Sequence, residues 1–260
     1  MGSDQGAAWD DSNLNDPHAV ADKRSRVQKM FTAIAPSYDL NNRVHSFWRD
    51  QAWRRKAVKL AKLKPMDVVV DVACGTGDLT LAFARGVNSP VIGIDFTHAM
   101  LPIANRKSQI ANPPTFLNAD ATALPLPDES ADVVSIAFGI RNVQAPEQAL
   151  REFHRVLRPG GRVIVLEFSE PTNPLIRAVN RFYCGRIMPI TATLISGDKS
   201  GAYKYLPKSI GTFWSREKMV AMLDEAGFIK IEQHPMTFGV CVCYRGEKAL
   251  VPSPSGRGLG

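Results

Sequence analysis

Short runs of β-branched and other apolar residues alternate along the chain with segments whose apolar residues recur every three or four positions. The runs at 68–73, 91–96, 115–120, 131–138 and 162–168 have the length of buried strands, and helical patterns lie between them. Parallel strands need such crossover connections, and a parallel sheet is usually covered by helices on both faces. The pattern therefore predicts a doubly wound α/β domain.

The end of the chain departs from this alternation. A helix is predicted at 215–226, with Ser215 as its N-cap and Gly227 just after its last turn. The two apolar runs at 228–233 and 240–245 then follow without a helical pattern between them, so we expect them to pair as a hairpin. The earlier crossover helices are predicted at 78–85, 98–109 and 147–157, the last closed by Pro159-Gly160-Gly161.

Both termini lack the composition of a folded core. Residues 1–22 contain five aspartates, few large apolar residues and no Lys or Arg, which predicts a disordered N-terminus. Residues 251–260 are rich in Pro, Ser and Gly and are expected to form a disordered tail. The predicted domain therefore spans 23–250, with a helical lid at 23–62 and an insertion at 170–213.

The composition narrows the class of protein further. At 260 residues and 45% hydrophobic, the chain can form one sizeable domain with a buried core. It contains no apolar run of about 18 residues, the length that a membrane-spanning helix requires. The four cysteines are not paired with histidines at metal-ligand spacing, so we expect reduced thiols and no metal site. A net charge of +7 fits attraction to nucleic acid, attraction to an anionic membrane, or solubility alone.

Glycines and acidic residues follow the first three predicted strands. Gly75 and Gly77 let the backbone approach a ligand closely, and Asp95 ends the next strand, where a carboxylate can accept both hydroxyls of a ribose. Asp120 ends the third strand and is placed to meet the amino group of an adenine. Thr80 stands where the dinucleotide fingerprint has a small residue, which disfavours NAD or flavin. These positions predict one nucleoside pocket; the alternatives are tight turns for the glycines and Asp120, and a helix N-cap for Asp95.

Longer segments resemble a known family. Residues 155–169, with the sequence RVLRPGGRVIVLEFS, resemble the second signature of the ubiquinone/menaquinone biosynthesis C-methyltransferase family. Segments 138–143 and 203–210 also look like family segments, and the similarity runs from about 29 to 248. The first signature is resembled by Tyr38-Asp39, Asn42, Ser46 and Trp53, and the chain departs from it at Asn41, His45 and Asp50.

The resemblance implies a class I S-adenosylmethionine-dependent methyltransferase, with a Rossmann-like, seven-stranded, mostly parallel sheet that ends in a hairpin strand. It implies S-adenosyl-L-methionine as cofactor and C-methylation of a polyprenylated quinol as the reaction. We expect demethylmenaquinol as the substrate, with a benzoquinol of ubiquinone biosynthesis as the alternative. Ala137 stands where the family often has serine and can offer only its backbone. The expected cofactor-binding residues are Asp71, Gly75, Thr76, Gly77, Asp95, Asp120, Ala121 and Ala137.

The implied reaction needs an activated phenol in a dry pocket, because a ring carbon becomes nucleophilic when the neighbouring phenol loses its proton. Arg141 and Asn142, just after the fourth strand, are candidates to stabilise and orient the phenolate. An arginine has a pKa above about 12, so we expect electrostatic stabilisation rather than proton abstraction, with a water as proton carrier. His45 and Tyr38 are candidates to cover the site as base or hydrogen-bond donor. The alternatives are a loop salt bridge for Arg141 and a solvated or packed position for His45.

Residues 174–196 are apolar and carry Arg177, Arg181 and Arg186 at spacings of four or five. This pattern predicts a basic amphipathic helix that rests on anionic lipid or walls a prenyl channel. The alternative is a core helix with a charged outer face. We expect a cytoplasmic protein, peripheral to the inner face of the membrane and without a nucleic-acid partner, and we leave a homodimer open.

Three rival functions are compatible with parts of the pattern. A nucleic-acid methyltransferase would suit the positive charge, but Asn112-Pro113-Pro114 precedes the third strand, whereas amino-methylating enzymes place such a motif after the fourth. A non-enzymatic cofactor-binding subunit would keep the nucleoside pocket and would not need Arg141. A small-molecule methyltransferase with another acceptor would not require a reductant. Transfer of labelled methyl groups, and its dependence on reductant, separates these alternatives.

Overall fold

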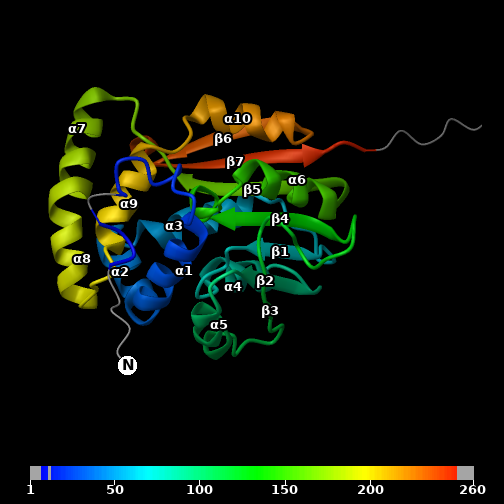
Figure 1. Ribbon diagram of the computed structural model, residues 1–260. Helices are drawn as coiled ribbons and strands as arrows, with labels where there is room; N and C mark the ends of the chain where they lie inside the picture. Colours follow the sequence, from blue (N-terminus) through cyan, green and yellow to red (C-terminus); the bar gives the residue numbers. More distant parts are fainter. Residues whose placement is uncertain (1–6, 11–12, 251–260) are drawn as a thin grey trace, which may run out of the picture.

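The computed structural model describes residues 7–10 and 13–250. At its centre is a seven-stranded sheet in the order β3-β2-β1-β4-β5-β7-β6 (Figure 1). The first five strands are parallel, and β7 is antiparallel to both of its neighbours, β5 and β6. The predicted doubly wound sheet with a terminal hairpin is therefore confirmed. The strands are β1 (Val69–Val72), β2 (Val91–Asp95), β3 (Thr115–Asn118), β4 (Ala131–Ala137), β5 (Leu157–Phe168), β6 (Phe228–Met236) and β7 (Cys241–Lys248).

Helices join the strands at the predicted places. The α10 helix begins after Ser215, whose Oγ accepts a hydrogen bond from the backbone N–H of Lys218 at 3.2 Å, so the predicted N-cap is confirmed. The α6 helix begins with Pro146, whose missing N–H would be unpaired in the first turn of any helix. The helices along the sheet are α4 (Asp78–Ala84), α5 (Leu101–Lys107), α6 (Pro146–Val156) and α10 (Arg216–Glu225).

Two hydrophobic clusters cover the two faces of the sheet. Successive residues of a strand point to opposite faces, and in β4 Val133 and Val134 belong to different clusters. On the face of Val134 lie α6 and α10, which contribute Phe153 among others. On the face of Val133 lie α4 and α3 (Arg49–Leu60), the helix that brings in Trp53. Both faces of the sheet are therefore covered by helices and shielded from water, as is usual for parallel strands.

One predicted boundary is wrong. The strand expected at 162–168 begins at Leu157 instead, so Pro159-Gly160-Gly161 lies within β5 and does not close the preceding helix. Ala131 pairs with Leu157, and the register then shifts before Val133 pairs with Arg162. This irregularity accommodates the Pro-Gly-Gly segment, because a bulge tolerates residues that a regular ladder does not.

The prediction of a disordered N-terminus is wrong for part of residues 7–22. Ala8, Trp9 and Leu14 are buried. The ring of Trp9 stacks on Tyr205 with centroids 4.3 Å apart, and its backbone N–H donates to the carbonyl of Ser200 at 3.0 Å. A few apolar side chains therefore anchor a segment that is otherwise polar. They pack against α1 (Lys23–Ile34) and α9 (Ala202–Gly211), whereas residues 1–6, 11–12 and 251–260 lie outside the described part of the chain.

A helical column stands beside the sheet at the left of Figure 1. It consists of α7 (Pro174–Phe182), the π-helical turn η4 (Tyr183–Ile187) and α8 (Met188–Ser196), and it contacts α2 (Tyr38–His45). No residue of α7 is buried, and in α8 only Ala192 is. The alternative of a core helix is therefore wrong. Within the described ranges, no helix has both the length and the apolar character needed to cross a membrane.

Candidate functional site

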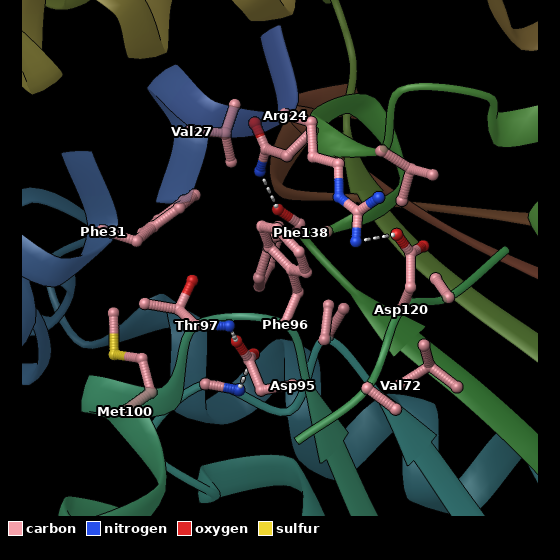
Figure 2. A pocket seen from close by; sticks show the side chains of 18 of the residues that line it. Arg24, Val27, Phe31, Val72, Asp95, Phe96, Thr97, Met100, Asp120 and Phe138 are labelled. Carbon is pink, nitrogen blue, oxygen red and sulfur yellow. Dashed lines mark hydrogen bonds and ion pairs between the residues drawn. The ribbon is translucent and has the colours of Figure 1, made fainter. Parts of the chain in front are cut away.

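A hollow opens beyond the carboxyl ends of β1, β2 and β4, where ligands bind in parallel α/β sheets. Its volume is about 780 Å³, including the space at its mouth. Figure 2 shows that α1 lies across it, with Val27 and Phe31 facing the strand ends. Seven of the predicted site residues line it: Tyr38, Gly75, Asp95, Asp120, Ala121, Ala137 and Asn142.

Asp95 lies on the floor of this hollow, at the end of β2. Its two carboxylate oxygens accept hydrogen bonds from the backbone N–H groups of Gly75 and Thr97, both at 2.7 Å (Figure 2). Burial raises the pKa of Asp95 to about 6, against which the two backbone N–H donors act only partly. A carboxylate so held keeps a fixed direction and has lone pairs left for two hydroxyl donors.

Gly75 brings open backbone to the same place. Its φ of +54° lies in the left-handed region, and among the described residues a Cβ built on it would meet only Tyr38, at 3.9 Å. Gly139 is constrained more tightly, because a Cβ there would lie 2.5 Å from the Cβ of Ala73. Ala73 and Phe138 have positive φ without being glycines, so the ends of β1 and β4 are both strained where they meet the hollow.

Asp120 marks the far end of the hollow. Its Oδ1 accepts hydrogen bonds from the backbone N–H and the hydroxyl of Thr122, at 2.9 and 2.8 Å. Its Oδ2 forms an ion pair with Nη2 of Arg24 at 3.1 Å (Figure 2). Arg24 belongs to α1, and its side chain extends from that helix to Asp120. The guanidinium of Arg24 lies 4.8 Å from the ring centroid of Phe96. This end of the hollow therefore has an aromatic wall, a carboxylate and a guanidinium.

Asn142 and Tyr38 add polar groups to the lining of the hollow. Asn142 belongs to the turn η3 (Ile140–Asn142), where its Oδ1 accepts from the hydroxyl of Tyr205 at 2.9 Å and its Nδ2 donates to the carbonyl of Phe138 at 3.2 Å. Burial raises the pKa of Tyr38, so its hydroxyl stays protonated and can donate a hydrogen bond.

Arg141 lies behind the hollow and does not line it. Its Nη1 donates to Oε1 of Glu167 at 2.6 Å and to the carbonyl of Phe138 at 2.7 Å. Both members of this ion pair are buried, so the charge of the guanidinium is compensated inside the protein. The structure thus brings Asn142 to the hollow but places Arg141 as a support for the turn that carries it.

His45 lies away from the hollow, in the last turn of α2. Its backbone carbonyl accepts a hydrogen bond from the hydroxyl of Tyr183 at 3.3 Å, so it faces the helical column. Burial lowers the pKa of His45, which keeps the ring neutral at pH 7. The structure therefore does not bring the two N-terminal candidates, His45 and Tyr38, together.

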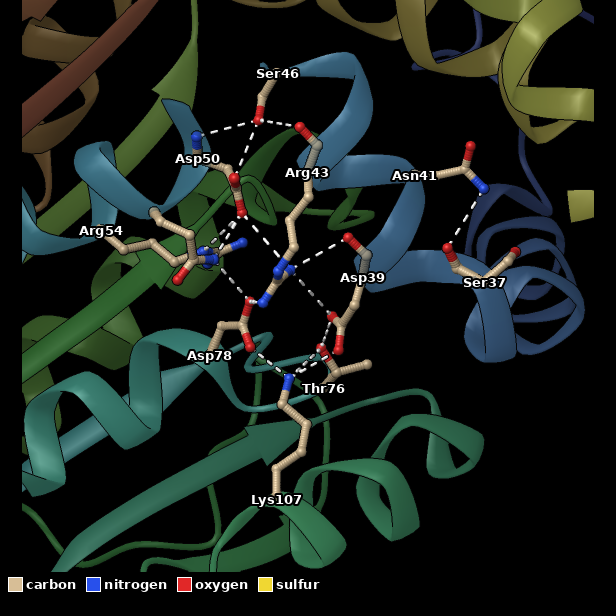
Figure 3. A network of polar contacts seen from close by, with 11 residues as sticks. Ser37, Asp39, Asn41, Arg43, Ser46, Asp50, Arg54, Thr76, Asp78 and Lys107 are labelled. Atoms are coloured by element: carbon tan, nitrogen blue, oxygen red, sulfur yellow. Dashed lines mark hydrogen bonds and ion pairs between the residues drawn. The ribbon is translucent and has the colours of Figure 1, made fainter. Parts of the chain in front are cut away.

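A smaller hollow of about 300 Å³ adjoins the first, with Asp71 and Thr76 in its wall. Asp71 accepts hydrogen bonds from the hydroxyls of Thr80 and Ser135, both at 2.6 Å, so its carboxylate ties β1 to its neighbours. The Thr76 hydroxyl donates to Asp39 of α2 at 2.5 Å (Figure 3). Gly77 lines neither hollow; with φ +83° it packs against Ala104 and Phe116, and it stands at the N-terminus of α4.

Helix α1 contributes three side chains to the hollow that the sequence pattern did not predict. Arg24, Val27 and Phe31 are spaced i, i+3 and i+7, so they share one face of that helix. This spacing was the signal available in the sequence, although it marks an amphipathic helix and does not reveal what its face covers. Only the packing of α1 against η2 (His98–Met100) and η3 places that face over the hollow.

The fold is that of solved methyltransferase structures. The structure matches a SAM-dependent methyltransferase from Thermotoga maritima with a TM-score of 0.59 and 24% identity, over 85% of this chain and 99% of that one. It also matches a SAM-dependent methyltransferase from Aquifex aeolicus with a TM-score of 0.54 and 18% identity, over 75% of this chain and 88% of that one. At these identities the likeness concerns the fold alone.

Sequence comparison identifies the family. The model of the ubiE/COQ5 methyltransferase family matches residues 19–248. The chain is 41% identical over 238 residues to the ubiquinone/menaquinone biosynthesis C-methyltransferase UbiE of Geobacter sulfurreducens, covering 90% of this chain and 92% of the relative. It is 46% identical over 221 residues to the demethylmenaquinone methyltransferase of Thermus thermophilus, covering 84% and 100%. The chain therefore belongs to the ubiE/COQ5 methyltransferase family, and the predicted resemblance is confirmed.

Proposed function

We propose that this protein transfers a methyl group from S-adenosyl-L-methionine to a ring carbon of a polyprenylated quinol, with demethylmenaquinol as the acceptor. The observation that carries the proposal is the hollow at the strand ends, which combines the Asp95 carboxylate with apolar walls and the polar side chains of Asn142 and Tyr38. The name of the Thermus relative supports the acceptor. A benzoquinol is the second candidate, favoured by the names of relatives such as the Geobacter enzyme.

The residues around the hollow fit the donor. Asp95 would accept the two ribose hydroxyls, and Asp120 with the backbone of Ala121 would hold the adenine edge. Gly75 would lie against the sulfur-bearing chain, because no side chain of its own fills the space above its backbone. Ala137 would contribute backbone only. When bound, the sulfonium donor would supply an electrophilic methyl group. The ring carbon beside a deprotonated phenol would take it up as the C–S bond breaks and S-adenosylhomocysteine leaves, and that carbon would then give up its hydrogen as a proton to restore the aromatic quinol.

Side chains on the acceptor side would orient the ring and exclude water. Asn142, fixed by Tyr205 and the Phe138 carbonyl, would hold an oxygen of the quinol. Tyr38 would donate a hydrogen bond to the same ring and stabilise negative charge as it develops on the oxygen. Arg141 would act as a positioning residue through the Phe138 carbonyl, and the helices at 23–62 and 170–213 would form the lid and the wall of the tail channel.

The helical column offers a surface for the membrane in which such an acceptor dissolves. Large apolar side chains of α7 and α8 are exposed, with Leu175 73% and Leu194 78% accessible. Residues 174–196 contain three arginines and no acidic residue, so the exposed face combines apolar and positive groups. Phe47 and Trp48, 72% and 60% exposed, lie at the end of α2 beside the column. We place the column on the surface of an anionic bilayer.

The direct test is methyl transfer by the purified protein. Labelled S-adenosylmethionine is incubated with demethylmenaquinone in vesicles, with and without dithionite to reduce it. We expect labelled menaquinone only with the reductant, because the oxidised ring is not nucleophilic. Transfer to the demethylated benzoquinol at a higher rate would favour the second acceptor, and binding of the donor without transfer to either ring would contradict the proposal.

A further inference from the structure

The smaller hollow continues the larger one. The two share the side chain of Tyr38 and the strand-end residues Ala73, Gly75 and Ala137. A ligand with its nucleoside over Asp95 would therefore pass Gly75 and enter the smaller hollow with whatever follows its 5′ carbon. What this second space can recognise depends on the polar groups in its wall.

Arg54 is the one cationic side chain among the described residues of that wall. It comes from α3, and its side chain is only 10% exposed. Its Nε has no hydrogen-bond partner among the described residues, and Oδ2 of Asp50 lies 4.0 Å away, beyond hydrogen-bond distance (Figure 3). The guanidinium stands 5.4 Å from the ring centroid of Phe138. A buried guanidinium with an unpaired donor is costly unless something else supplies an acceptor.

The carboxylates near Arg54 already have other partners. Oδ2 of Asp78 forms an ion pair with Nη2 of Arg43 at 2.8 Å, and its Oδ1 forms one with Nζ of Lys107 (Figure 3). Burial alone would raise the pKa of Asp78, but the charges of Arg54, Lys107 and Arg43 outweigh it and lower this pKa to about 2. Asp71 is held by two hydroxyl groups. These anions balance the charge of the network without satisfying the Nε of Arg54.

We propose that Arg54 binds the α-carboxylate of the amino-acid end of the sulfonium donor. The proposal rests on the proposed function only in taking the donor's nucleoside to occupy the larger hollow. A guanidinium matches a carboxylate because its N–H groups form a planar fork that can donate two parallel hydrogen bonds. The acidic residues in the same wall, Asp71 and Asp78, make the hollow suitable for a zwitterion, whose ammonium group needs acceptors. An α3 residue of the N-terminal helices thereby becomes part of the donor site.

The test compares two ligands by isothermal titration calorimetry. S-adenosylhomocysteine carries the carboxylate, and 5′-methylthioadenosine lacks the whole amino-acid end. We expect Arg54→Met to weaken binding of S-adenosylhomocysteine about ten- to a hundredfold, the range for hydrogen bonds to a charged group. Binding of 5′-methylthioadenosine should change less than about twofold. Arg55→Met, an exposed neighbour on the same helix, is the matched control and should leave both affinities unchanged.

The outcomes separate this proposal from the function on which it rests. If Arg54→Met lowers the affinity for both ligands equally, or lowers neither affinity, the proposed role of Arg54 is wrong. If the wild-type protein binds neither ligand, the proposed donor is wrong. Arg54→Lys covers the case in which Arg54→Met does not fold: it keeps the charge but loses the fork, and we expect a weaker yet still ligand-selective loss. A loss in Arg54→Lys that is the same for both ligands would also reject the proposal.

Discussion

Nη1 of Arg141 lies 2.6 Å from Oε1 of Glu167, with the two side chains 3% and 2% exposed. The pair joins the turn after β4 to the end of β5, and the same guanidinium holds the carbonyl of Phe138. Removing one partner of such a pair leaves an uncompensated buried charge, whereas the intact pair adds little net stability. Because the Arg141–Glu167 pair links these two segments, its main effect is to fix the geometry of the turn that carries Asn142.

Glu167→Gln should destabilise the protein by about 3–5 kcal/mol, because the buried Arg141 charge would lose its counter-ion. Urea denaturation followed by circular dichroism measures this difference. Glu170→Gln is the control, since Glu170 pairs with Arg181 on the surface, with side chains 37% and 64% exposed, and should cost less than about 1 kcal/mol. Equal effects of the two substitutions would show that the Arg141–Glu167 pair does not hold the turn.

The pKa of Asp95 predicts opposite pH dependences for donor binding and for stability. Because burial raises this pKa to about 6, the carboxyl becomes protonated below that pH and offers fewer acceptor sites to the ribose. S-adenosylhomocysteine affinity should therefore fall as the pH drops through about 6. In the absence of ligand, the contribution of Asp95 to stability should fall as the pH rises from about 4 to about 6, since the folded state holds the proton more tightly than the unfolded chain.

Asp95→Asn tests this assignment. We expect at least about tenfold weaker binding of S-adenosylhomocysteine at pH 7.5, because a charged acceptor is lost, and a nearly flat pH dependence between 5 and 7. Calorimetric titrations across that range measure both. A variant that keeps the wild-type affinity, or keeps its pH dependence, would remove Asp95 from the donor site.

Tyr205→Phe should lower kcat without weakening donor binding. The Tyr205 hydroxyl donates to Oδ1 of Asn142 at 2.9 Å, and without it the amide can rotate. We expect kcat to fall about tenfold while the Kd for S-adenosylhomocysteine stays within about twofold, since a misplaced orienting group weakens alignment more than binding. Tyr183→Phe is the control, because that hydroxyl bonds to the His45 carbonyl outside the hollow. If the two variants have the same kcat, Asn142 does not depend on Tyr205.

The exposed face of α7 should bind anionic membranes. Leu175, Val179 and Phe182 are spaced i, i+4 and i+7 and are 73%, 62% and 62% exposed. Replacing all three by Asn should lower the affinity for anionic vesicles, measured by co-sedimentation, about tenfold or more. The reason is that insertion of apolar side chains and attraction of the arginines to anionic lipid act together. Met66→Asn, 73% exposed in the loop before β1, is the control. Binding that survives the triple substitution, or that is equally strong on zwitterionic vesicles, would reject this surface.

Local patterns predicted most of the sheet and the donor edge. Alternating apolar runs predicted the strands, and Gly75, Asp95 and Asp120 were identified because the carboxyl ends of parallel strands share one edge. All three line the hollow. The prediction was wrong where a few long-range contacts outweigh local composition, as at Trp9, which stacks on Tyr205, a residue far away in the sequence.

The sequence by itself determined the succession of strands and helices along the chain, the acidic residues at the strand ends and the family. These features depend on periodicity and on residues near one another in the chain. Only the tertiary structure decided which side chains reach the hollow. It turned Arg141 inward to Glu167 and placed Arg24 over Asp120. It also left Arg54 buried in the same wall as Gly75, where no side chain or backbone group of residues 7–10 and 13–250 pairs with its Nε. The physical reason is that a side chain's burial and charge partners are set by segments packed across the sheet edge, and no local spacing specifies them.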